Sequence, residues 1–532
     1  MIRFVGLIFL IVLVQDCDSM DSVNFATDYY SSSVLGLLKL LEIERQFMEE
    51  FVGHADVLQE KLDNLQMYID SLDRTKHESH KERERFVSNP LNAYGLIRRL
   101  QQDWPKWQNY TKKPLGTAQL QGMEELLLKA PDNHDMTESL KSMDRIERTY
   151  DLPASQIARG LLQHQQYDTQ LSVRDCLALA QHKNVSGDYI RASMWYREAL
   201  RHESEPNAEI INAVLGNPLE GVEHQFASAI IIRELGLSGK SLSRTRMQGV
   251  ASHFLTNSKP QVVDAFIRHY LAESDEGIAK ELGTLQTPPT SREFGCRGLY
   301  AKRTNLVCRY NSTTTPFLRL APLKMEEISH DPYIVMYHQV LSDREIGEMK
   351  QLAQPMTNGL SGSIEANNSE PLEVVARIAW LLEASPFRER LNLRIGDMTG
   401  FDVSEFKALQ VANFGVGSYF KAHFDYLTNR IVDTSISQLG DRTGSLIIYA
   451  GEVQQGGATI FPDIQVMVPP QKGNSLFWYN TFDDSTPDPR SLHAVCPVIA
   501  GSRWTVTKWL HQWPQMFLKP CSPRPRAVER KS

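Results

Sequence analysis

A histidine and an aspartate separated by one residue, His423 and Asp425, lie in the stretch HFDYL. Alternate side chains of an extended strand point to the same face, so this pair can offer an imidazole nitrogen and a carboxylate oxygen to one point. His493, in RSLHAVCPV, is the candidate third ligand. Two histidines and one carboxylate on one face suit non-haem Fe(II). Taken alone, His-x-Asp fits a surface histidine beside a hydrogen-bonded aspartate better.

A basic residue follows the third candidate ligand. Arg503 comes ten residues after His493, in GSRWTVTKWLH. A guanidinium binds a carboxylate through two parallel hydrogen bonds. A buried arginine near such a metal could therefore hold the distal carboxylate of a keto diacid. The alternatives are that Lys508 has this role, or that Arg503 is a simple surface charge.

The residues that position these side chains have the pattern of a β domain. Short apolar runs after Pro332 are broken by Gly, Pro and Asp, and they predict strands at YIVMYHQVL, LQVANF, SLIIYAG and SLFWYN. Helices are expected over 342–352 and 373–382. The C-terminal part of the chain is therefore predicted to be mainly β.

The N-terminal half has helical periodicity instead. From residue 37 the apolar positions step by three and four, interrupted only at Glu44: Leu37, Leu41, Met48, Phe51, Ala55, Leu58, Leu62, Leu65, Ile69 and Leu72. This heptad pattern predicts a long helix that buries one stripe against another helix. The partner could be a helix of the same chain or of a second copy. Further helical patterns cover 92–107 and 136–150.

A helical hairpin is predicted over 171–200, and a second helix pair over 222–235 and 241–255. Their stacking resembles degenerate tetratricopeptide repeats, which form concave grooves for extended peptides. Tyr189, Trp195 and Tyr196 are the aromatic residues on or near such a groove. Aromatic residues at helical spacing are more often part of the core, so both interpretations stay open.

The first residues have the pattern of a secretory signal. A cationic start is followed by eleven apolar residues, Phe4 to Val14, which are too few to span a bilayer. Cleavage is expected near residues 17–20, and the alternative is a buried N-terminal strand. No later run is long enough for a membrane helix. The net charge of -7 gives no basic footprint for nucleic acid.

Secretory entry places the six cysteines in an oxidising compartment. Cys296 and Cys308 could close a small loop, and Cys496 and Cys521 could link the C-terminal segment. Cys176 lies in a helical pattern and is expected to be a buried free thiol. Four glycosylation sequons agree with a lumenal protein: Asn109, Asn184, Asn311 and Asn367. The chain ends in ERKS, which is not an ER-retrieval signal.

Several motifs together resemble collagen prolyl 4-hydroxylase α subunits. Those similar to the catalytic domain are HFDYL, GGATIFP (456–462), LFWYN (476–480), HAVCPV and TKWLH. NPLNAYGLIRRL and RIERTYDL resemble the N-terminal dimerisation domain of that family. SVRDCLAL and GDYIRASMWYREAL resemble its peptide-substrate-binding domain. The resemblance covers nearly the whole mature chain.

The resemblance implies an all-α N-terminal half followed by a double-stranded β-helix (jelly roll). The implied divisions are a signal peptide (1–19), a dimerisation domain (24–155), a TPR-like domain (165–275), a linker with a local disulfide (276–331), a catalytic domain (332–512, oxygenase core from about 405) and a tail (513–532). It also implies an α2β2 tetramer with protein disulfide isomerase in the endoplasmic reticulum lumen, where the partner carries the retrieval signal. No membrane insertion is expected.

The implied activity is procollagen-proline 4-dioxygenase. His423, Asp425 and His493 would hold Fe(II), and Arg503 would hold 2-oxoglutarate. With O2, the enzyme would hydroxylate C4 of proline in X-Pro-Gly sequences of collagen-like chains, which favour polyproline II, and release succinate and CO2. Ascorbate would restore iron that is oxidised in uncoupled turnovers.

The chain departs from the family pattern around this site. Arg503 stands where the family usually has lysine, and Ser445, expected near that cation, where it usually has threonine. Phe414 and Phe420 replace tyrosines that contact 2-oxoglutarate and lie near the peptide. A hydroxyl bound to a carboxylate is worth about 1.5–3 kcal/mol, so Phe414 could raise the 2-oxoglutarate requirement roughly ten- to a hundred-fold.

These departures favour an active but specialised enzyme. One alternative is a non-catalytic paralogue that binds Pro-rich chains. Another is a lysyl hydroxylase or a further 2-oxoglutarate hydroxylase acting on a different peptide, against which the helical N-terminal domains weigh.

Overall fold

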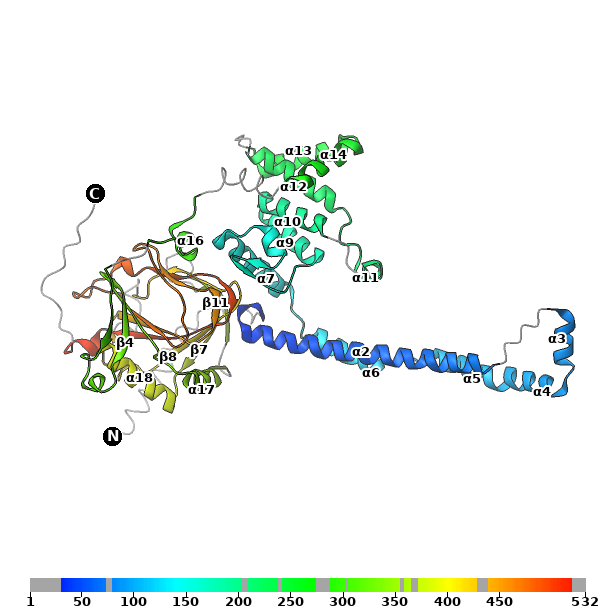
Figure 1. Cartoon of the computed structure of the whole chain (residues 1–532), viewed down its shortest axis with the longest axis horizontal. Helices are drawn as coiled ribbons and strands as arrows, with labels where there is room; N and C mark the ends of the chain where they lie inside the picture. Colours follow the sequence, from blue (N-terminus) through cyan, green and yellow to red (C-terminus); the bar gives the residue numbers. More distant parts are fainter. Residues whose placement is uncertain are drawn as a thin grey trace. The chain divides into compact units, whose positions relative to one another are not determined.

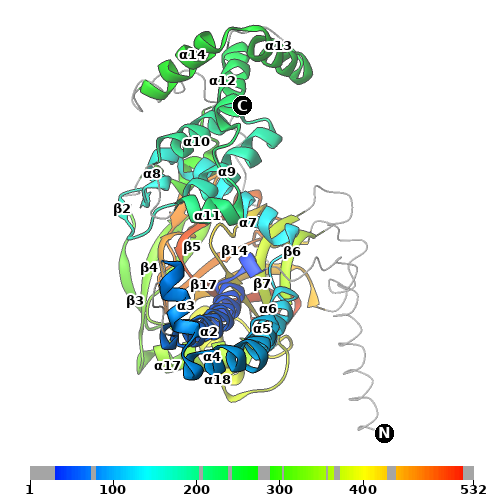
Figure 2. The same cartoon turned by 90° about the vertical axis from the view of Figure 1, so that its right-hand side faces the viewer.

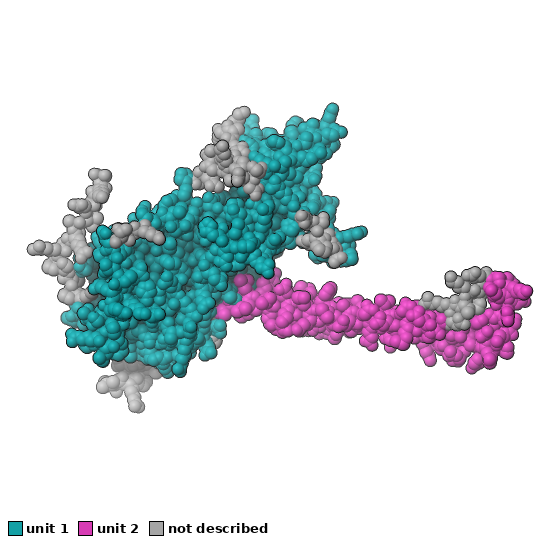
Figure 3. Space-filling view, in the orientation of Figure 1, with its two compact units in different colours: residues 1–34, 133–532 teal, residues 35–132 magenta. Residues whose placement is uncertain are grey.

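The structure is a computed structural model, which describes residues 30–72, 79–202, 208–237, 242–273, 288–301, 305–354, 358–364, 372–427 and 439–518 (Figure 1). The predicted signal peptide, Cys521, Asn367 and the end of the tail lie outside these ranges. Contacts divide the chain into two compact units, residues 35–132 and residues 1–34 with 133–532 (Figure 3). The predicted boundary at residue 155 differs from this division, because helix α7 (Asn133–Tyr150) belongs to the larger unit.

The smaller unit is built on the long helix that the heptad pattern predicts, α2 (Val34–Ser71). It is followed by α3 (His80–Val87), α4 (Pro90–Arg98), a π-helical turn (Arg99–Asp103), α5 (Trp104–Lys112) and α6 (Thr117–Leu127). One face of α2 packs on α5: the Tyr68 ring stacks on Trp107 at 4.4 Å, and Asn64 Nδ2 donates to Tyr110 Oη at 3.1 Å. The heptad stripe lies elsewhere on α2 and stays largely exposed, with Met48 and Phe51 both 62% accessible.

The larger unit contains α7 and a run of further helices (Figure 2). These are α8 (Ala154–Ala158), α9 (Val173–Ser186), α10 (Tyr189–Arg201), α11 (Ala208–Leu215), α12 (Val222–Leu237), α13 (Arg244–Asn257) and α14 (Pro260–Ala272). The predicted hairpin and second helix pair are both present. Ser172 starts α9 with a capping box, since its side chain accepts the Asp175 N–H while Asp175 binds the Ser172 N–H.

Packing in these helices corrects the expectation for two aromatic residues. Trp195 is fully buried, and its indole N–H donates to Glu147 Oε2 at 3.2 Å. Tyr189 is also buried, and its hydroxyl accepts hydrogen bonds from Arg244 at 2.8 Å and Gln248 at 3.1 Å. Both side chains belong to the helical core, so the prediction that they contact a peptide is wrong.

The C-terminal part forms a large sheet whose strands curve around a common interior (Figure 1). The strands are β3 (Cys308–Asn311), β4 (Leu323–His330), β5 (Tyr333–Tyr337), β6 (Asn358–Ile364), β7 (Leu372–Leu381), β8 (Leu409–Phe414), β9 (Phe420–His423), β10 (Arg442–Tyr449), β12 (Thr459–Phe461), β13 (Val466–Val468), β14 (Ser475–Tyr479), β15 (His493–Val495) and β17 (Arg503–His511). Their order is β13-β12-β15-β9-β7-β8-β17-β10-β14-β5-β4-β3, with β6 paired to β7. Two short pairs stand apart, β1 (Leu161–Leu162) with β2 (Gln165–Gln166) and β11 (Val453–Gly456) with β16 (Val498–Gly501).

The four strands predicted from apolar runs are present as β5, β8, β10 and β14, and the helix predicted over 342–352 is α17 (Asp343–Ala353). The helix predicted over 373–382 is wrong, because this segment is strand β7, paired with β6, β8 and β9. Its β-branched residues fit the half-buried surface of a sheet. A second helix, α18 (Pro386–Thr399), follows β7.

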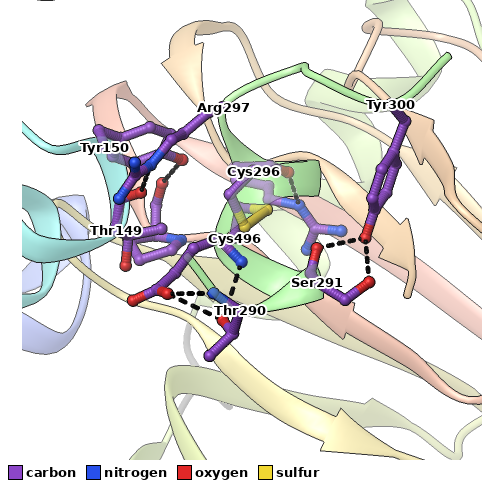
Figure 4. Close-up of a disulfide and its surroundings, with 12 residues drawn as sticks. Thr149, Tyr150, Thr290, Ser291, Cys296, Arg297, Tyr300 and Cys496 are labelled. Atoms are coloured by element: carbon purple, nitrogen blue, oxygen red, sulfur yellow. Dashed lines mark hydrogen bonds between the residues drawn. A yellow bond between two sulfur atoms is a disulfide. The ribbon is translucent and has the colours of Figure 1, made fainter. Parts of the chain in front are cut away.

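The segment predicted as a linker, 276–331, contains structure of its own. Helix α16 (Ser291–Cys296) packs against β12, whereas β3 and β4 join the far end of the sheet order. Cys296 and Cys308 therefore lie on elements at opposite ends of that order, and the predicted pairing is wrong. Cys296 bonds Cys496 instead, because Cys496 follows β15, the neighbour of β12 (Figure 4). The predicted pairing of Cys496 with Cys521 is therefore also wrong. Cys308 is an exposed free thiol, and Cys176 is a buried free thiol as expected.

Two further expectations concern the surface. Asn311 is 8% exposed, and its amide nitrogen donates to the Met398 carbonyl at 3.3 Å, so this sequon is not available for a glycan. Asn109 is exposed on α5, and Asn184 is partly exposed on α9. Within the described ranges, every helix is either too short or too polar to cross a bilayer.

Candidate active site

The three candidate metal ligands lie at the ends of neighbouring strands. β9 and β15 pair antiparallel, with His423 directly opposite His493, and Asp425 follows β9 by two residues. His423 Nε2 lies 3.7 Å from Asp425 Oδ1, and His493 Nε2 lies 3.8 Å from Asp425 Oδ2. All three side chains are buried, and their ligand atoms lie within 4.8 Å of one another. The structure thus brings together the residues that the sequence proposed.

Backbone carbonyls set the orientation of both imidazoles. The Nδ1 atom of His423 lies 2.9 Å from the Lys421 carbonyl oxygen, and that of His493 lies 3.0 Å from the Ser491 carbonyl oxygen. When Nδ1–H donates to these carbonyls, each Nε2 lone pair faces the common centre. This is the arrangement that metal-binding histidines need, and these residues therefore fit a divalent cation.

Burial and charge favour the metal-binding protonation states. Burial, reinforced by neighbouring His493, lowers the pKa of His423 to about 3. Burial disfavours ionisation of Asp425, but the two histidines and a hydroxyl outweigh that effect and hold the pKa of its carboxyl below its usual value. A neutral imidazole and an ionised carboxylate are the forms that bind a metal.

Arg503 begins β17, opposite Phe414 of β8. Its Nε donates to the Gly457 carbonyl at 3.0 Å, and Nη2 donates to Thr459 Oγ1 at 3.2 Å. The guanidinium is 1% exposed and lies over the rings of Phe414 and Tyr449, 4.8 and 5.5 Å from their centroids. Burial lowers its pKa to about 10, so it stays charged at neutral pH.

Among the described residues, no carboxylate lies within ion-pairing distance of Arg503. A buried cation without an anionic partner is costly, and the site therefore fits a ligand that brings a carboxylate. Lys508 does not fit this role. It lies five residues along β17, which turns its side chain to the opposite face, and its ammonium group donates to the Phe406 carbonyl.

Comparison with known proteins gives the same outline. The model described as "Prolyl 4-Hydroxylase alpha-subunit, N-terminal region" matches residues 33–164, and that of the 2OG-Fe(II) oxygenase superfamily matches residues 409–511. Prolyl 4-hydroxylase subunit alpha-1 of Bos taurus is 28% identical over 516 residues, which cover 93% of this chain and 95% of the relative. The Mus musculus subunit alpha-1 is 29% identical over 518 residues, with the same coverage. The chain is therefore similar to prolyl 4-hydroxylase α subunits over nearly its whole length.

The match to the oxygenase superfamily and these relatives identify the chain as a dioxygenase whose C-terminal domain uses Fe(II) and 2-oxoglutarate. A solved viral collagen prolyl hydroxylase from Paramecium Bursaria Chlorella virus-1, in a 2OG complex, is 20% identical and aligns with a TM-score of 0.25 over 34% of this chain and 95% of its own.

The hydroxyl of Ser445 contacts a residue of the candidate metal site. The resemblance predicts a hydroxyl near Arg503 at this position, and in the structure the hydroxyl donates to Asp425 Oδ2 at 2.6 Å and accepts from Asn480 Nδ2 at 2.8 Å. Ser445 therefore orients the carboxylate of the metal site. Asn480, at the end of the LFWYN motif, holds Ser445 in turn.

Aromatic rings surround the two histidines. Phe420 stacks on His423 with ring centroids 3.8 Å apart, and it is partly exposed. Trp478 meets His493 edge-on at 4.8 Å, and Phe461 lies 5.8 Å from the same ring. These rings limit the access of water to the ligand nitrogens.

The sequence did not single out two residues of this site. The hydroxyls of Tyr449 and Thr459 lie 2.9 Å apart, and both side chains border Arg503. Tyr449 is on the same strand face as Ser445, four residues along β10. The alternation in SLIIYAG could have indicated that Ser445 and Tyr449 lie on one face of β10, where the first contacts Asp425 and the second contacts Arg503. Thr459 gave no sequence signal, since its position depends on how β12 meets β17.

Proposed function

We propose that this chain is the catalytic α subunit of a prolyl 4-hydroxylase that acts on X-Pro-Gly sequences of collagen-like chains. The observation that carries the proposal is the convergence of His423, Asp425 and His493 together with Arg503, a buried cation without a carboxylate partner in the described part of the chain. Fe(II), when bound with 2-oxoglutarate, supplies the oxidation by O2 that gives 4-hydroxyproline, succinate and CO2. Ascorbate is the proposed reductant that maintains Fe(II).

The side chains of the site have separate tasks in this proposal. The two Nε2 atoms and Asp425 hold the metal, and Ser445 fixes the rotamer of the aspartate. Arg503 binds the distal carboxylate of 2-oxoglutarate and thereby orients the co-substrate toward the metal. Phe420 lies beside His423 and is the candidate contact for the substrate proline.

The replacement of tyrosine by Phe414 supports a raised 2-oxoglutarate requirement. Its ring packs on the guanidinium of Arg503 but offers no hydroxyl to a carboxylate. The hydroxyls of Tyr449 and Thr459 beside the same cation offset part of that loss. We therefore expect an active enzyme with weak affinity for its co-substrate.

We also propose that two copies of the chain associate through α2. Its heptad residues Leu41, Met48, Phe51, Leu58 and Leu62 are between 49% and 62% exposed, although their spacing is that of a coiled-coil seam. The α2 helix of a second copy carries the same apolar stripe and can pack against it. With protein disulfide isomerase as the second subunit, this gives an α2β2 tetramer in the endoplasmic reticulum lumen.

The helices α9 to α14 are the proposed TPR-like binding site for the substrate chain. Because Tyr189 and Trp195 are buried, the contacts must come from other side chains of this module. The proposed TPR-like domain extends from residue 165 to residue 275, and the proposed linker begins at residue 276.

The test measures hydroxyproline and succinate together. The full chain is co-expressed with disulfide isomerase and supplied with Fe(II), ascorbate and a Pro-Pro-Gly repeat peptide over a wide range of 2-oxoglutarate. Equal amounts of the two products, both abolished by His423→Ala, are expected. If no turnover occurs at any concentration while the peptide still binds, the chain is a non-catalytic binder of Pro-rich chains. Hydroxylation of another residue would indicate a different hydroxylase.

A further inference from the structure

The last residue of α7 reaches from the helical part of the chain into the catalytic domain. Tyr150 is 6% exposed, and its hydroxyl donates to the Pro497 carbonyl at 2.6 Å, a contact that joins residues 347 positions apart. Figure 4 shows Tyr150 on the α7 side of the Cys296–Cys496 disulfide. This contact has no part in binding the metal or in the proposed direct contacts with 2-oxoglutarate.

The same carbonyl is bound by a turn that contacts Arg503. The Gly457 N–H donates to the Pro497 carbonyl at 3.1 Å, and the Gly457 carbonyl accepts from Arg503 Nε at 3.0 Å. Gly456 and Gly457 have φ values of +76° and +66°, which favour glycine. The turn also passes close to the tyrosine, because a Cβ at residue 456 would lie 2.9 Å from the Tyr150 hydroxyl.

We infer that Tyr150 is a positioning residue for Arg503, and that this helical segment thereby sets the affinity for 2-oxoglutarate. The Tyr150 hydroxyl fixes the Pro497 carbonyl, which fixes the Gly457 peptide. That peptide directs its own carbonyl to Nε and so orients the rest of the guanidinium. The inference rests on the proposed function, in which Arg503 binds the distal carboxylate of the co-substrate.

The turn at Gly457 carries hydrogen-bond acceptors that orient the guanidinium of Arg503, in addition to the rings of Phe414 and Tyr449 against which it packs. The guanidinium donates hydrogen bonds to Gly457 and Thr459, which lie within three residues of each other. Cys496 braces the same turn, since its N–H donates to the Ala458 carbonyl at 2.9 Å and its sulfur is bonded to α16. A shift of the turn would therefore move both acceptors of the guanidinium.

A second tyrosine of the helical part provides a matched control. The Tyr167 hydroxyl donates to the Gln455 side chain at 3.0 Å, at the edge of the same turn. It does not contact the Pro497 carbonyl or the Gly457 peptide. Tyr167→Phe and Tyr150→Phe each remove one hydroxyl from the same surface, but only Tyr150→Phe should change the orientation of Arg503.

The experiment uses the full chain co-expressed with disulfide isomerase. Binding of 2-oxoglutarate and of succinate to the anaerobic Fe(II) protein is measured by calorimetry, and KM and kcat are measured separately. Tyr150→Phe should weaken both dicarboxylates and raise the KM for 2-oxoglutarate about three- to ten-fold, the range that one neutral hydrogen bond controls. The value of kcat and the KM for the peptide should stay within two-fold, and Tyr167→Phe should resemble the wild type.

A double variant tests the proposed route. Lysine has no Nε–H to donate to Gly457, so adding Tyr150→Phe to Arg503→Lys should cost no further affinity. Unchanged dicarboxylate affinity in folded Tyr150→Phe would overturn the inference while leaving the proposed function intact. Equal losses for dicarboxylate and peptide would also overturn it, because they would show a general structural role. A wild-type protein that binds neither dicarboxylate would overturn both proposals.

Discussion

The hydroxyl of Ser445 offers the sharpest test of the metal site. It donates to Asp425 Oδ2 at 2.6 Å and is itself held by Asn480, and all three groups are buried. Ser445→Ala removes a hydrogen bond to a charged acceptor, worth about 1.5–3 kcal/mol, and leaves the Asn480 amide without its partner. Loss of such a support for a metal ligand typically weakens metal binding about ten- to a hundred-fold.

The assay measures the Fe(II) concentration that gives half-maximal activity and the dissociation constant (Kd) for Fe(II) of the anaerobic protein. Both should rise by that factor in Ser445→Ala, while the KM for 2-oxoglutarate should change little, since Ser445 does not contact Arg503. Ser445→Thr is the matched control, because it keeps the hydroxyl and should bind Fe(II) almost as the wild type does. Unchanged Fe(II) affinity in the alanine variant, or an equal loss in the threonine variant, would refute this reasoning.

Phe414→Tyr restores a hydroxyl beside Arg503 and should lower the KM for 2-oxoglutarate about ten-fold, and an unchanged KM would show that position 414 does not contact the co-substrate. Phe51→Glu places a charge in the exposed stripe of α2 and should convert the dimer into a slower-sedimenting species by analytical ultracentrifugation, whereas Glu60→Lys, outside the stripe, should leave it dimeric. Burial lowers the pKa of His511 to about 4 from 6.5. As the pH falls, the unfolded chain therefore binds a proton at His511 before the folded chain does. The free energy of unfolding keeps this contribution in full above pH 6.5 and loses up to about 3 kcal/mol as the pH falls to 4. His511→Gln should flatten the pH dependence of urea denaturation between these two values. A non-reducing digest should yield the peptides of Cys296 and Cys496 as one linked species, and recovery of Cys296 linked to Cys308 would contradict the structure.

The sequence by itself determined the chemistry and most of the local structure. The His-x-Asp spacing, the distant His493 and the cation Arg503 named residues that the fold does bring to one place. The heptad stripe predicted α2, and alternating apolar runs predicted β5, β8, β10 and β14. These features are set by periodicity and by the needs of a ligand set, which are properties of neighbouring residues or of residue types.

Only the tertiary structure decided which distant groups meet. Cys296 bonds Cys496 because α16 packs beside β12, although Cys308 is far closer along the chain. Ser445 serves Asp425 because of the pairing of β10 within the sheet, and Trp195 enters the core because helices stack on both sides of it. The contact of Tyr150 with Pro497 likewise depends on the docking of α7. Such partners follow from topology and strand order, which no local pattern in a single sequence contains.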